Sequence, residues 1–396
     1  MRSILLASFL ALARSLPWPF SWDTVPSLAF PGAANRMMTE AEVDNFAANF
    51  SAITIWGLNA TCINVTTGAA FPADCPPAAS SCHCNVPEPR SVNQRFVQSM
   101  ESSLRAQAVA LKAAAAQRGK FLPVLGYIES GAMDQYSSAQ ARAMYDPALS
   151  SFRLSLESVG LVDCFRDGCN YQGVEFRQFD LRLPEVRAYV ATQVLGLLVN
   201  DSALDGSFID TLENQHIYLC RSVNCTPEEV SGIRAGSLLY LSAMLDAGAA
   251  AGKVISASCH VTPGQDRLYY EDYIAALVAH SNSSIRYWEF FSTGSLNMFM
   301  SEVAQGLAQH VHVRSRTLNP DWVELAAFLI GAGDHCYFSC SGPWNLDSFS
   351  VFPEFQKPLG KPLGAAVLHN GSWTRSFESL DVTFSPGSGE ATLAWK

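Results

Sequence analysis

Short runs of apolar residues recur along the chain, and segments with helical spacing separate most of them. Each run has the length typical of a β-strand. Eight strands are predicted from these runs, at 52–56, 121–128, 176–181, 207–210, 254–259, 286–291, 311–313 and 336–339.

Helical patterns lie between these runs. Residues 92–117 are rich in Ala, Leu, Gln and Arg, which favour helix. Apolar residues from Val186 to Leu198 recur at helical spacing, and Pro227 opens a predicted helix that runs towards Ala251. Further helices are predicted near 266–280, 295–309 and 320–330. Strands that alternate with helices indicate a parallel sheet covered by helices, so eight repeats predict an α/β fold, the closed (β/α)8 or TIM barrel.

Two regions depart from this alternation. Residues 62–90 are rich in Cys, Pro, Ala and Ser, and we expect a disulfide-rich insertion after the first strand. Residues 382–384 and 391–395 flank a Pro/Gly turn, which predicts a C-terminal β-hairpin. The expected organisation is a barrel over residues 14–365, followed by a β appendage over residues 366–396.

The first thirteen residues have the pattern of a signal peptide. Arg2 precedes an apolar stretch from Ile4 to Leu12, and Ala11-Leu12-Ala13 offers a small-x-small cleavage site. No later segment reaches the roughly 20 apolar residues that a membrane-spanning helix needs. We therefore expect residues 1–13 to be removed and the protein to be secreted or to remain in the lumen of the secretory pathway.

Cysteine usage agrees with an oxidising compartment. The chain has 11 cysteines, and the closely spaced pairs Cys164/Cys169, Cys220/Cys225 and Cys336/Cys340 are candidate disulfides. Cys259 stands apart in an apolar run and is expected to be a buried free thiol. A zinc site at Cys82-His83-Cys84 is a weaker alternative, because the spacing differs from known zinc motifs.

Glycosylation signals point the same way. Seven Asn-x-Ser/Thr sequons begin at Asn49, Asn59, Asn64, Asn200, Asn224, Asn282 and Asn370. With a signal peptide they predict a secreted glycoprotein. The net charge is −10 with only 16% charged residues, so nothing attracts nucleic acid or an anionic membrane.

Asp210 is the first candidate for chemistry. It ends the run Asp205-Gly206-Ser207-Phe208-Ile209-Asp210, which predicts a turn and then a short buried strand. The C-terminal ends of barrel strands face the active site, where a carboxylate can act as nucleophile or base. A helix cap or a salt-bridged loop acid is the alternative interpretation.

Glu289 is the second candidate and lies in a later strand, among Tyr287, Trp288, Phe290 and Phe291. Apolar surroundings favour the protonated form of a carboxyl group, which suits a general acid. The alternative is a structural glutamate paired with Arg314 or Arg316. Glycosidic bonds are cleaved by two such carboxyl groups, so Asp210 and Glu289 predict a glycoside hydrolase.

Further residues near the strand ends are candidate substrate contacts. Those able to bind sugar hydroxyls, or to stack on a sugar face, are Glu129, Asp180, His260, Trp56, Tyr127, Trp288, Arg314 and Tyr337. Asp180 has an alternative role in capping the turn before Pro184, and each aromatic residue has one in core packing. Glu129 is the substitute acid should Glu289 be structural.

Other chemistries find little support. The chain has no dinucleotide-binding or Walker motif with the right flanks, no G-x-S-x-G elbow and no H-E-x-x-H, so we expect no cofactor and no metal. His310 and His312 flank a valine, so they could share one face of a strand and bind a metal. A mixed strand with one solvated face is the favoured interpretation of this pair.

Several short motifs, taken in order, resemble a known family. They are Phe20 to Pro26, Phe179-Asp180-Leu181 with Pro184 to Arg187, Asp205 to Asp210, Thr374 to Glu378, and the closing strand Ala391 to Trp395. They are similar to a group of hypothetical glycosyl-hydrolase-like barrels found in algae and other eukaryotes. The resemblance implies a barrel and a carbohydrate substrate. A secreted glycoside hydrolase is the first hypothesis, and a catalytically inactive extracellular carbohydrate-binding barrel is the second.

Overall fold

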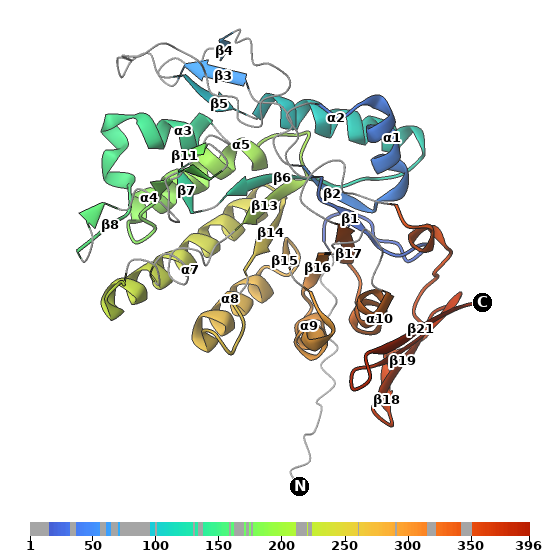
Figure 1. The fold of residues 1–396 in the computed structure, drawn as a ribbon. Coiled ribbons are helices and arrows are strands. Elements are labelled where there is room, and N and C mark those ends of the chain that lie inside the picture. Colours follow the sequence, from blue (N-terminus) through green and yellow to red (C-terminus); the bar gives the residue numbers. More distant parts are fainter. Residues whose placement is uncertain are drawn as a thin grey trace.

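Eight parallel strands form the central sheet of the protein, as a computed structural model shows (Figure 1). In sheet order they are β1 (Leu28–Ala29), β2 (Ala52–Ile55), β6 (Val124–Glu129), β13 (Gly206–Asp210), β14 (Val254–Ser258), β15 (Ser284–Trp288), β16 (Ala308–Arg314) and β17 (Cys336–Ser341). The backbone N–H of Phe338 donates to the carbonyl of Pro26 at 2.8 Å, which joins the last strand to the first. The predicted (β/α)8 barrel is therefore confirmed.

The structure describes most of the barrel, but not every loop. The described residues are 16–31, 37–55, 61–64, 70–71, 96–99, 101–129, 131–133, 138–157, 160–161, 170–171, 174–175, 177–210, 220, 224–259, 261–289, 291–314, 322–341 and 351–396. The predicted signal peptide and most of the cysteine-rich segment lie outside them.

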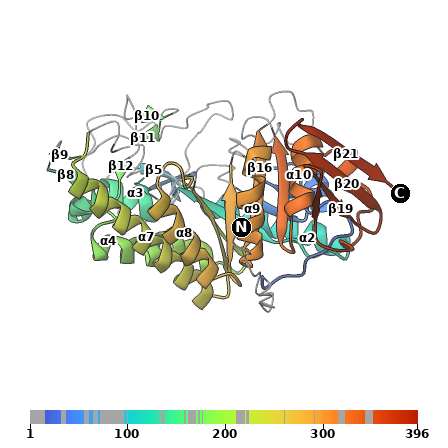
Figure 2. The same cartoon turned by 90° about the horizontal axis from the view of Figure 1, so that it is seen from below.

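Helices surround the sheet, as two views at right angles show (Figures 1 and 2). The main ones are α1 (Glu40–Asn49), α2 (Glu101–Gln117), α3 (Ser138–Tyr145), α4 (Pro184–Tyr189), α5 (Leu195–Val199), α7 (Pro227–Ala250), α8 (Arg267–Ala279), α9 (Leu296–Ala304) and α10 (Trp322–Gly331). A π-helical segment, Val190–Val194, joins α4 to α5. Capping boxes at Thr39/Glu42 and Thr226/Glu229 satisfy the first backbone donors of α1 and α7.

One of the eight predicted strands is wrong. Of the predicted run 176–181, the described residues 177–181 are not part of the barrel, because β13 pairs directly with β6 and leaves no place between them. That segment instead holds β12 (Arg177–Gln178), which pairs antiparallel with β7 (Ala132–Met133). The eighth barrel strand is β1, which is two residues long and therefore too short to show a hydrophobic period.

The insertion after β2 contains structure that its composition did not predict. Strands β3 (Thr61–Asn64), β4 (Ala70–Phe71) and β5 (Phe96–Ser99) form a small antiparallel sheet. Because β5 takes residues 96–99, α2 begins at Glu101 and not near residue 92. The pairing of β5 with β3 thus moves the start of the helix to Glu101, and the Ala-rich stretch that follows forms α2 as its propensity predicts.

The predicted C-terminal hairpin is confirmed as half of a larger sheet. Strands β18 (Val367–His369), β19 (Ser372–Ser376), β20 (Leu380–Ser385) and β21 (Glu390–Trp395) pair in order, all antiparallel. Phe377, Val382 and Phe384 are buried in one apolar cluster with residues of α10. The Arg375 guanidinium donates to the carbonyls of Leu329, at 2.8 Å, and Ala332, at 2.6 Å, at the end of α10.

Apolar side chains fill the N-terminal end of the barrel. The buried cluster there, called the lower layer below, comprises Leu28, Ala52, Leu125, Val254, Ile285, Ala308 and Tyr337, with Leu16 and Trp18 packed against them. The Trp18 indole donates to the Tyr337 hydroxyl at 2.9 Å. Residues that alternate with these face the surrounding helices, as strand geometry requires.

The described cysteines confirm some predictions and correct another. Cys220 and Cys225 form the predicted disulfide, and Cys259 is a buried thiol outside any disulfide, as predicted. Cys336 and Cys340 are not joined to each other, so their predicted disulfide is wrong. Both lie on β17, where residues four apart are separated by about 13 Å, roughly twice the Cα distance that a disulfide spans.

Within the described residues, no helix combines the length and the apolar character that crossing a bilayer requires.

Candidate active site

Asp210 ends β13, Glu289 directly follows the last residue of β15, and both continue the inward-facing rows of these strands. Phe208 on β13 and Tyr287 on β15 belong to one buried cluster inside the barrel. Asp210 follows Phe208 by two residues, and Glu289 follows Tyr287 by two, so each carboxylate continues the inward row of its strand. Both are half-buried. The strand pattern thus directs both acids towards the C-terminal end of the barrel interior.

The strand register brings these two residues to a similar height. Phe208 is paired with Ser256, and Ser256 with Ile285, so Glu289 lies two residues further along the sheet than Asp210. Strands of a closed barrel are tilted, and inward residues of alternate strands share one layer. β13 and β15 are alternate strands. The tilt of the barrel strands therefore compensates the two-residue shift between Asp210 and Glu289, and the two residues lie at a similar height.

Four rings lie beneath the carboxylates and are called the aromatic floor below. They are Phe30, Tyr127, Phe208 and Tyr287. Tyr127 stacks on Phe208 with centroids 5.7 Å apart, and Tyr287 meets Phe208 edge-on at 4.7 Å. The floor separates the acids from the lower layer and excludes water from below. A carboxylate above such a surface interacts more strongly with polar partners than it would in water.

The two tyrosines of the aromatic floor bear directly on the acids. The Tyr127 hydroxyl donates to Oδ2 of Asp210 at 2.9 Å, a charge-assisted bond that favours the ionised carboxylate. The pKa of the Tyr287 hydroxyl is raised well above its usual value, first by burial and then by the negative charges of Glu289 and Asp210. Both carboxylates therefore act on the same hydroxyl group, and this electrostatic link joins the two strand ends.

The start of β13 is held firmly. The Asp205 carboxylate accepts from the Val124 backbone N–H at 2.8 Å and from the Lys112 ammonium at 2.9 Å. A side chain on Gly206 would place its Cβ 1.9 Å from the Val254 carbonyl, so only glycine fits. Asp205 and Gly206, which open the Asp205–Asp210 motif, thus have structural roles. Asp210 is the acid of this motif that lies at the C-terminal mouth of the barrel.

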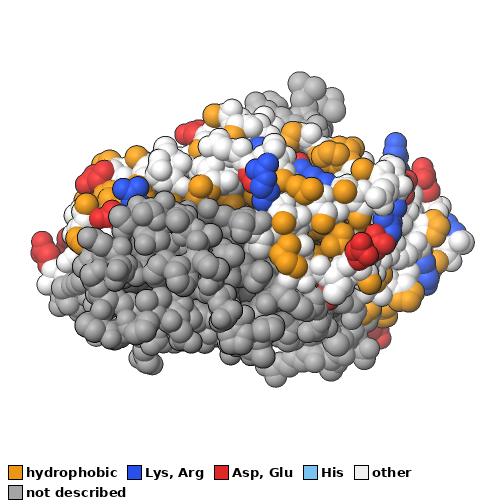
Figure 3. Space-filling model, turned by 90° about the horizontal axis from the view of Figure 1, so that it is seen from above, with side chains coloured by type: hydrophobic (Ala, Val, Ile, Leu, Met, Phe, Trp, Pro, Cys, Tyr) orange, Lys and Arg blue, Asp and Glu red, His pale blue; other side chains and the backbone are white. Residues whose placement is uncertain are grey.

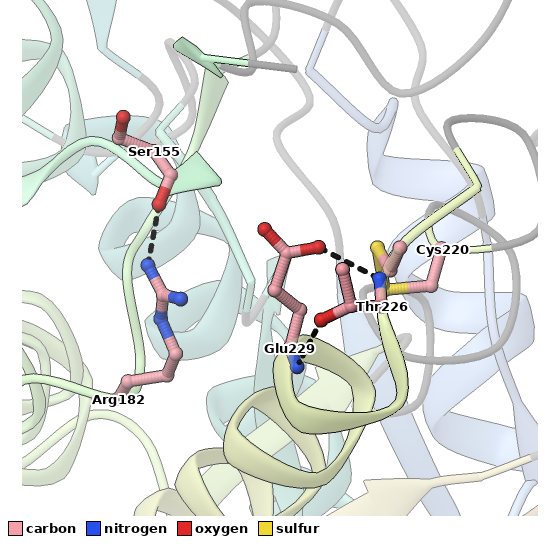
Figure 4. Close-up of a disulfide and its surroundings, with 6 residues drawn as sticks. Ser155, Arg182, Cys220, Thr226 and Glu229 are labelled. Atoms are coloured by element: carbon pink, nitrogen blue, oxygen red, sulfur yellow. Dashed lines mark hydrogen bonds between the residues drawn. A yellow bond between two sulfur atoms is a disulfide. The ribbon is translucent and has the colours of Figure 1, made fainter. Parts of the chain in front are cut away.

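A disulfide anchors the chain where it returns from β13 to α7 (Figure 4). Cys220 and Cys225 are linked just before the helix, and Thr226 forms its capping box with Glu229. Arg182, on the neighbouring turn, donates to the Ser155 carbonyl. The disulfide and the capping box thus hold the residues immediately before α7 and its first turn.

His310 and His312 lie inside the barrel beside the aromatic floor, and the predicted solvated strand face is wrong. Both imidazoles are fully buried. His312 Nδ1 lies 3.0 Å from the Glu289 carbonyl and its Nε2 lies 2.9 Å from the Ser341 hydroxyl, so neither nitrogen of this ring is free to bind a metal. His310 Nε2 contacts the Ser339 hydroxyl at 2.8 Å. Burial, and secondarily the neighbouring His312, holds the pKa of His310 well below its usual value.

Three of the predicted contact residues lie away from the two acids. Asp180, expected at a barrel strand end, precedes α4 outside the barrel, where its carboxylate accepts from Arg182 Nε at 2.8 Å. Trp288 faces the helices, with its indole bonded to Gln309 at 2.6 Å and the Arg286 guanidinium 4.0 Å from its ring. Tyr337 belongs to the lower layer, at the opposite end of the barrel.

The remaining predicted contacts are placed by their backbone alone or lie outside the described residues. Glu129 ends β6 in register with Asp210, and Arg314 ends β16, but neither side chain is described. Trp56 and His260 lie outside the described part of the chain. Of the predicted contacts, the structure thus brings Tyr127 into direct contact with a candidate catalytic acid.

Sequence reasoning missed Tyr287, His312 and Ser341 as parts of the site. Alternation would have found Tyr287, since an inward Glu289 makes Tyr287 inward and Trp288 outward. The contacts of His312 and Ser341 depend on how β15, β16 and β17 are paired, which no local pattern shows.

On the face seen in Figure 3, acidic and basic side chains are interspersed with apolar ones over the described part of the surface. No extended field of one sign is visible there.

A parallel (β/α)8 barrel that carries two carboxylates at its C-terminal mouth is an architecture widely used by glycoside hydrolases. The family comparison agrees with this class. The chain belongs to hypothetical glycosyl hydrolase family 15, whose model matches residues 122–381 and thus covers both Asp210 and Glu289. The predicted family is thereby confirmed. Among curated proteins, none matches this sequence.

Several solved structures have a similar shape. Ega3 of Aspergillus fumigatus, solved with galactosamine, is 12% identical over 84% of this chain and 96% of its own, with a TM-score of 0.39. A cyclomaltodextrinase is 10% identical over 91% and 69%, with a TM-score of 0.43. An Anoxybacillus α-amylase is 9% identical over 92% and 87%, with a TM-score of 0.41.

Proposed function

We propose that this protein is a secreted glycoside hydrolase that cleaves an O-glycosidic bond with Asp210 and Glu289 as its two catalytic carboxyl groups. The observation that carries the proposal is their shared position. Both continue inward rows at the C-terminal ends of alternate strands, and both raise the pKa of Tyr287 between them. Membership of a glycosyl hydrolase family supports the same chemistry.

The surroundings of the two acids suggest different roles. Asp210 accepts a hydrogen bond from Tyr127, which favours the ionised form needed for attack on the anomeric carbon or for activation of water. Glu289 is then the general acid that protonates the leaving oxygen. The substrate is a carbohydrate bound above the aromatic floor, and the reaction calls for no cofactor.

The proposal is tested by a hydrolysis assay over a broad panel of glycans and aryl glycosides. Wild type should cleave at least one of them, and Asp210→Asn and Glu289→Gln should each lose this activity. Asp272→Asn, a matched change at an exposed acid on α8, should not. Circular dichroism of all variants should be the same. Binding of a glycan without cleavage by wild type would contradict the proposal and support the inactive carbohydrate-binding barrel.

Secretion is proposed from residues 1–13 and from the sequons. Asn200, Asn224, Asn282 and Asn370 are exposed in the folded protein, which is compatible with attached glycans. Expression of the full chain in a eukaryotic cell should release a glycosylated protein whose N-terminus follows Ala13. Retention in the cytosol without glycans would overturn this part of the proposal.

A further inference from the structure

His312 contacts both ends of the short turn that carries Glu289. β15 ends at Trp288, so Glu289 is the first residue beyond the regular ladder. The His312 ring lies 3.0 Å from the Glu289 carbonyl through Nδ1. Two residues later, the backbone N–H of Phe291 donates to the His312 carbonyl at 3.0 Å. One residue of β16 thus holds residues 289 and 291 through its side chain and its main chain.

These contacts determine the tautomer of His312. A carbonyl oxygen only accepts hydrogen bonds, so Nδ1 must carry the proton that it donates to Glu289. In the neutral ring Nε2 is then an acceptor, and the Ser341 hydroxyl, 2.9 Å away, must be its donor. The chain of bonds runs from Ser341 on β17 through His312 to the backbone of Glu289.

His310, two residues earlier on the same strand, has the opposite arrangement. The Ser339 hydroxyl donates to the Val311 carbonyl at 3.3 Å, so it accepts from Nε2 of His310 at 2.8 Å. His310 is therefore protonated on Nε2 and His312 on Nδ1. Two histidines in one inward row are thus distinguishable by their protonated nitrogen.

We propose that His312 is a positioning residue for catalysis, which sets the direction of the Glu289 side chain by holding the Glu289 carbonyl. This inference rests on the proposed function, because Glu289 is the general acid there. The imidazole is fully buried and bonded at both nitrogens, so it has no alternative position to occupy. Without it, the Glu289 carbonyl loses the donor that ties it to β16, while the bond from the Phe291 N–H to the main chain of His312 remains. A misplacement of about 1 Å in a reacting group is enough to lower a rate about 100-fold.

The test uses two amide substitutions that each reproduce one ring nitrogen. In His312→Asn the amide nitrogen lies near the position of Nδ1 and keeps the bond to Glu289. In His312→Gln the amide nitrogen lies near the position of Nε2, so this variant keeps the contact with Ser341 and loses the bond to Glu289. We expect His312→Gln to lower kcat about 100-fold with little change in KM, and His312→Asn to stay within about tenfold of wild type.

A purely structural role would affect both variants alike. Equal losses of kcat in the two, or losses that follow their melting temperatures, would overturn the positioning role. His280→Gln is the matched control, because His280 also bonds a backbone carbonyl through Nδ1, that of Ala276 at 3.0 Å, but lies at the end of α8. This control should leave kcat and KM unchanged.

The tautomers give a readout that needs no substrate. The chain has eight histidines, so selective ¹⁵N labelling and long-range ¹H–¹⁵N spectra can resolve them, with the variants providing assignments. We expect the Nδ1–H form for His312 and the Nε2–H form for His310. An Nε2–H form for His312 would overturn the geometry whatever the activity. If wild type hydrolyses nothing on the glycan panel while the tautomers are as expected, the proposed function fails and the catalytic role of His312 fails with it.

Discussion

The two ends of the barrel interior are built from the same strands but from opposite kinds of residue. The lower layer is apolar, and its one hydroxyl, that of Tyr337, is bonded to Trp18. Above the aromatic floor, the same strands end in carboxylates, and histidine–serine pairs lie alongside. The difference shows how one barrel separates its tasks, with the N-terminal end supplying stability and the C-terminal end presenting groups for chemistry.

The largest expected effect tests the upper end. Asp210→Asn should lower hydrolysis by about 10³–10⁴-fold, because it removes an acid–base or nucleophilic group while keeping the shape of the side chain. Chemical denaturation should show an unfolding free energy within about 0.5 kcal/mol of wild type. A variant that unfolds more easily and loses activity only in proportion would contradict the separation of tasks.

The second effect tests the lower end. Ile285 is fully buried there, and Ile285→Ala should lower the unfolding free energy by about 2–5 kcal/mol, while Ile285→Val should lower it by about 0.5–1.5 kcal/mol. Because the lower layer lies beneath the aromatic floor, kcat of the folded fraction should change little. Denaturation curves and steady-state kinetics on the same samples check both statements. A large loss of kcat in Ile285→Val would show that the two ends are coupled.

The third effect compares two tyrosine hydroxyl groups, that of Tyr127 at the C-terminal end of the barrel and that of Tyr337 at the N-terminal end. Tyr127→Phe removes the hydrogen bond to Asp210, so kcat/KM should fall about tenfold. The acidic limb of the pH–rate profile should move to higher pH, because the ionised carboxylate loses a donor. Tyr337→Phe removes a bond of the lower layer and should leave the profile in place. Equal shifts of the acidic limb in Tyr127→Phe and Tyr337→Phe would contradict the proposed difference between the two ends of the barrel.

The smallest effect concerns pH and the polar residues between the two ends. Because burial lowers the pKa of His310, the unfolded chain takes up a proton below about pH 6.5 that the folded protein does not bind. Stability should therefore fall as pH decreases below that value, and His335, whose pKa is also lowered by burial, adds to the trend. His310→Gln should reduce the slope by up to about 1.4 kcal/mol per pH unit. Urea denaturation between pH 5.5 and 7.5 measures this slope, and identical slopes in the variant and the wild type would show that His310 titrates alike in the folded and unfolded chain.

Local patterns predicted most of the barrel and both acids. The runs at 207–210, 254–259 and 336–339 were long and apolar enough to identify β13, β14 and β17. β1 could not be found, since two residues show no period, and the apolar run at 176–181 took its place. The missed polar contacts have one physical origin. His312 reaches Glu289 across 23 positions of the chain and Ser341 across 29, so strand pairing and not local sequence brings them together.

The C-terminal sheet bears on how shortened forms of the protein will behave. Phe377, Leu380 and Phe384 complete the same core as Leu325 and Phe328 of α10. A chain cut at residue 365 would expose that helix face to water and would leave the carbonyls at its end without Arg375. Such a product is expected to aggregate, although the cut removes neither carboxylate nor any barrel strand. Residues 366–396 are therefore part of the smallest unit worth expressing, and a tag is better attached beyond Lys396 than in place of them.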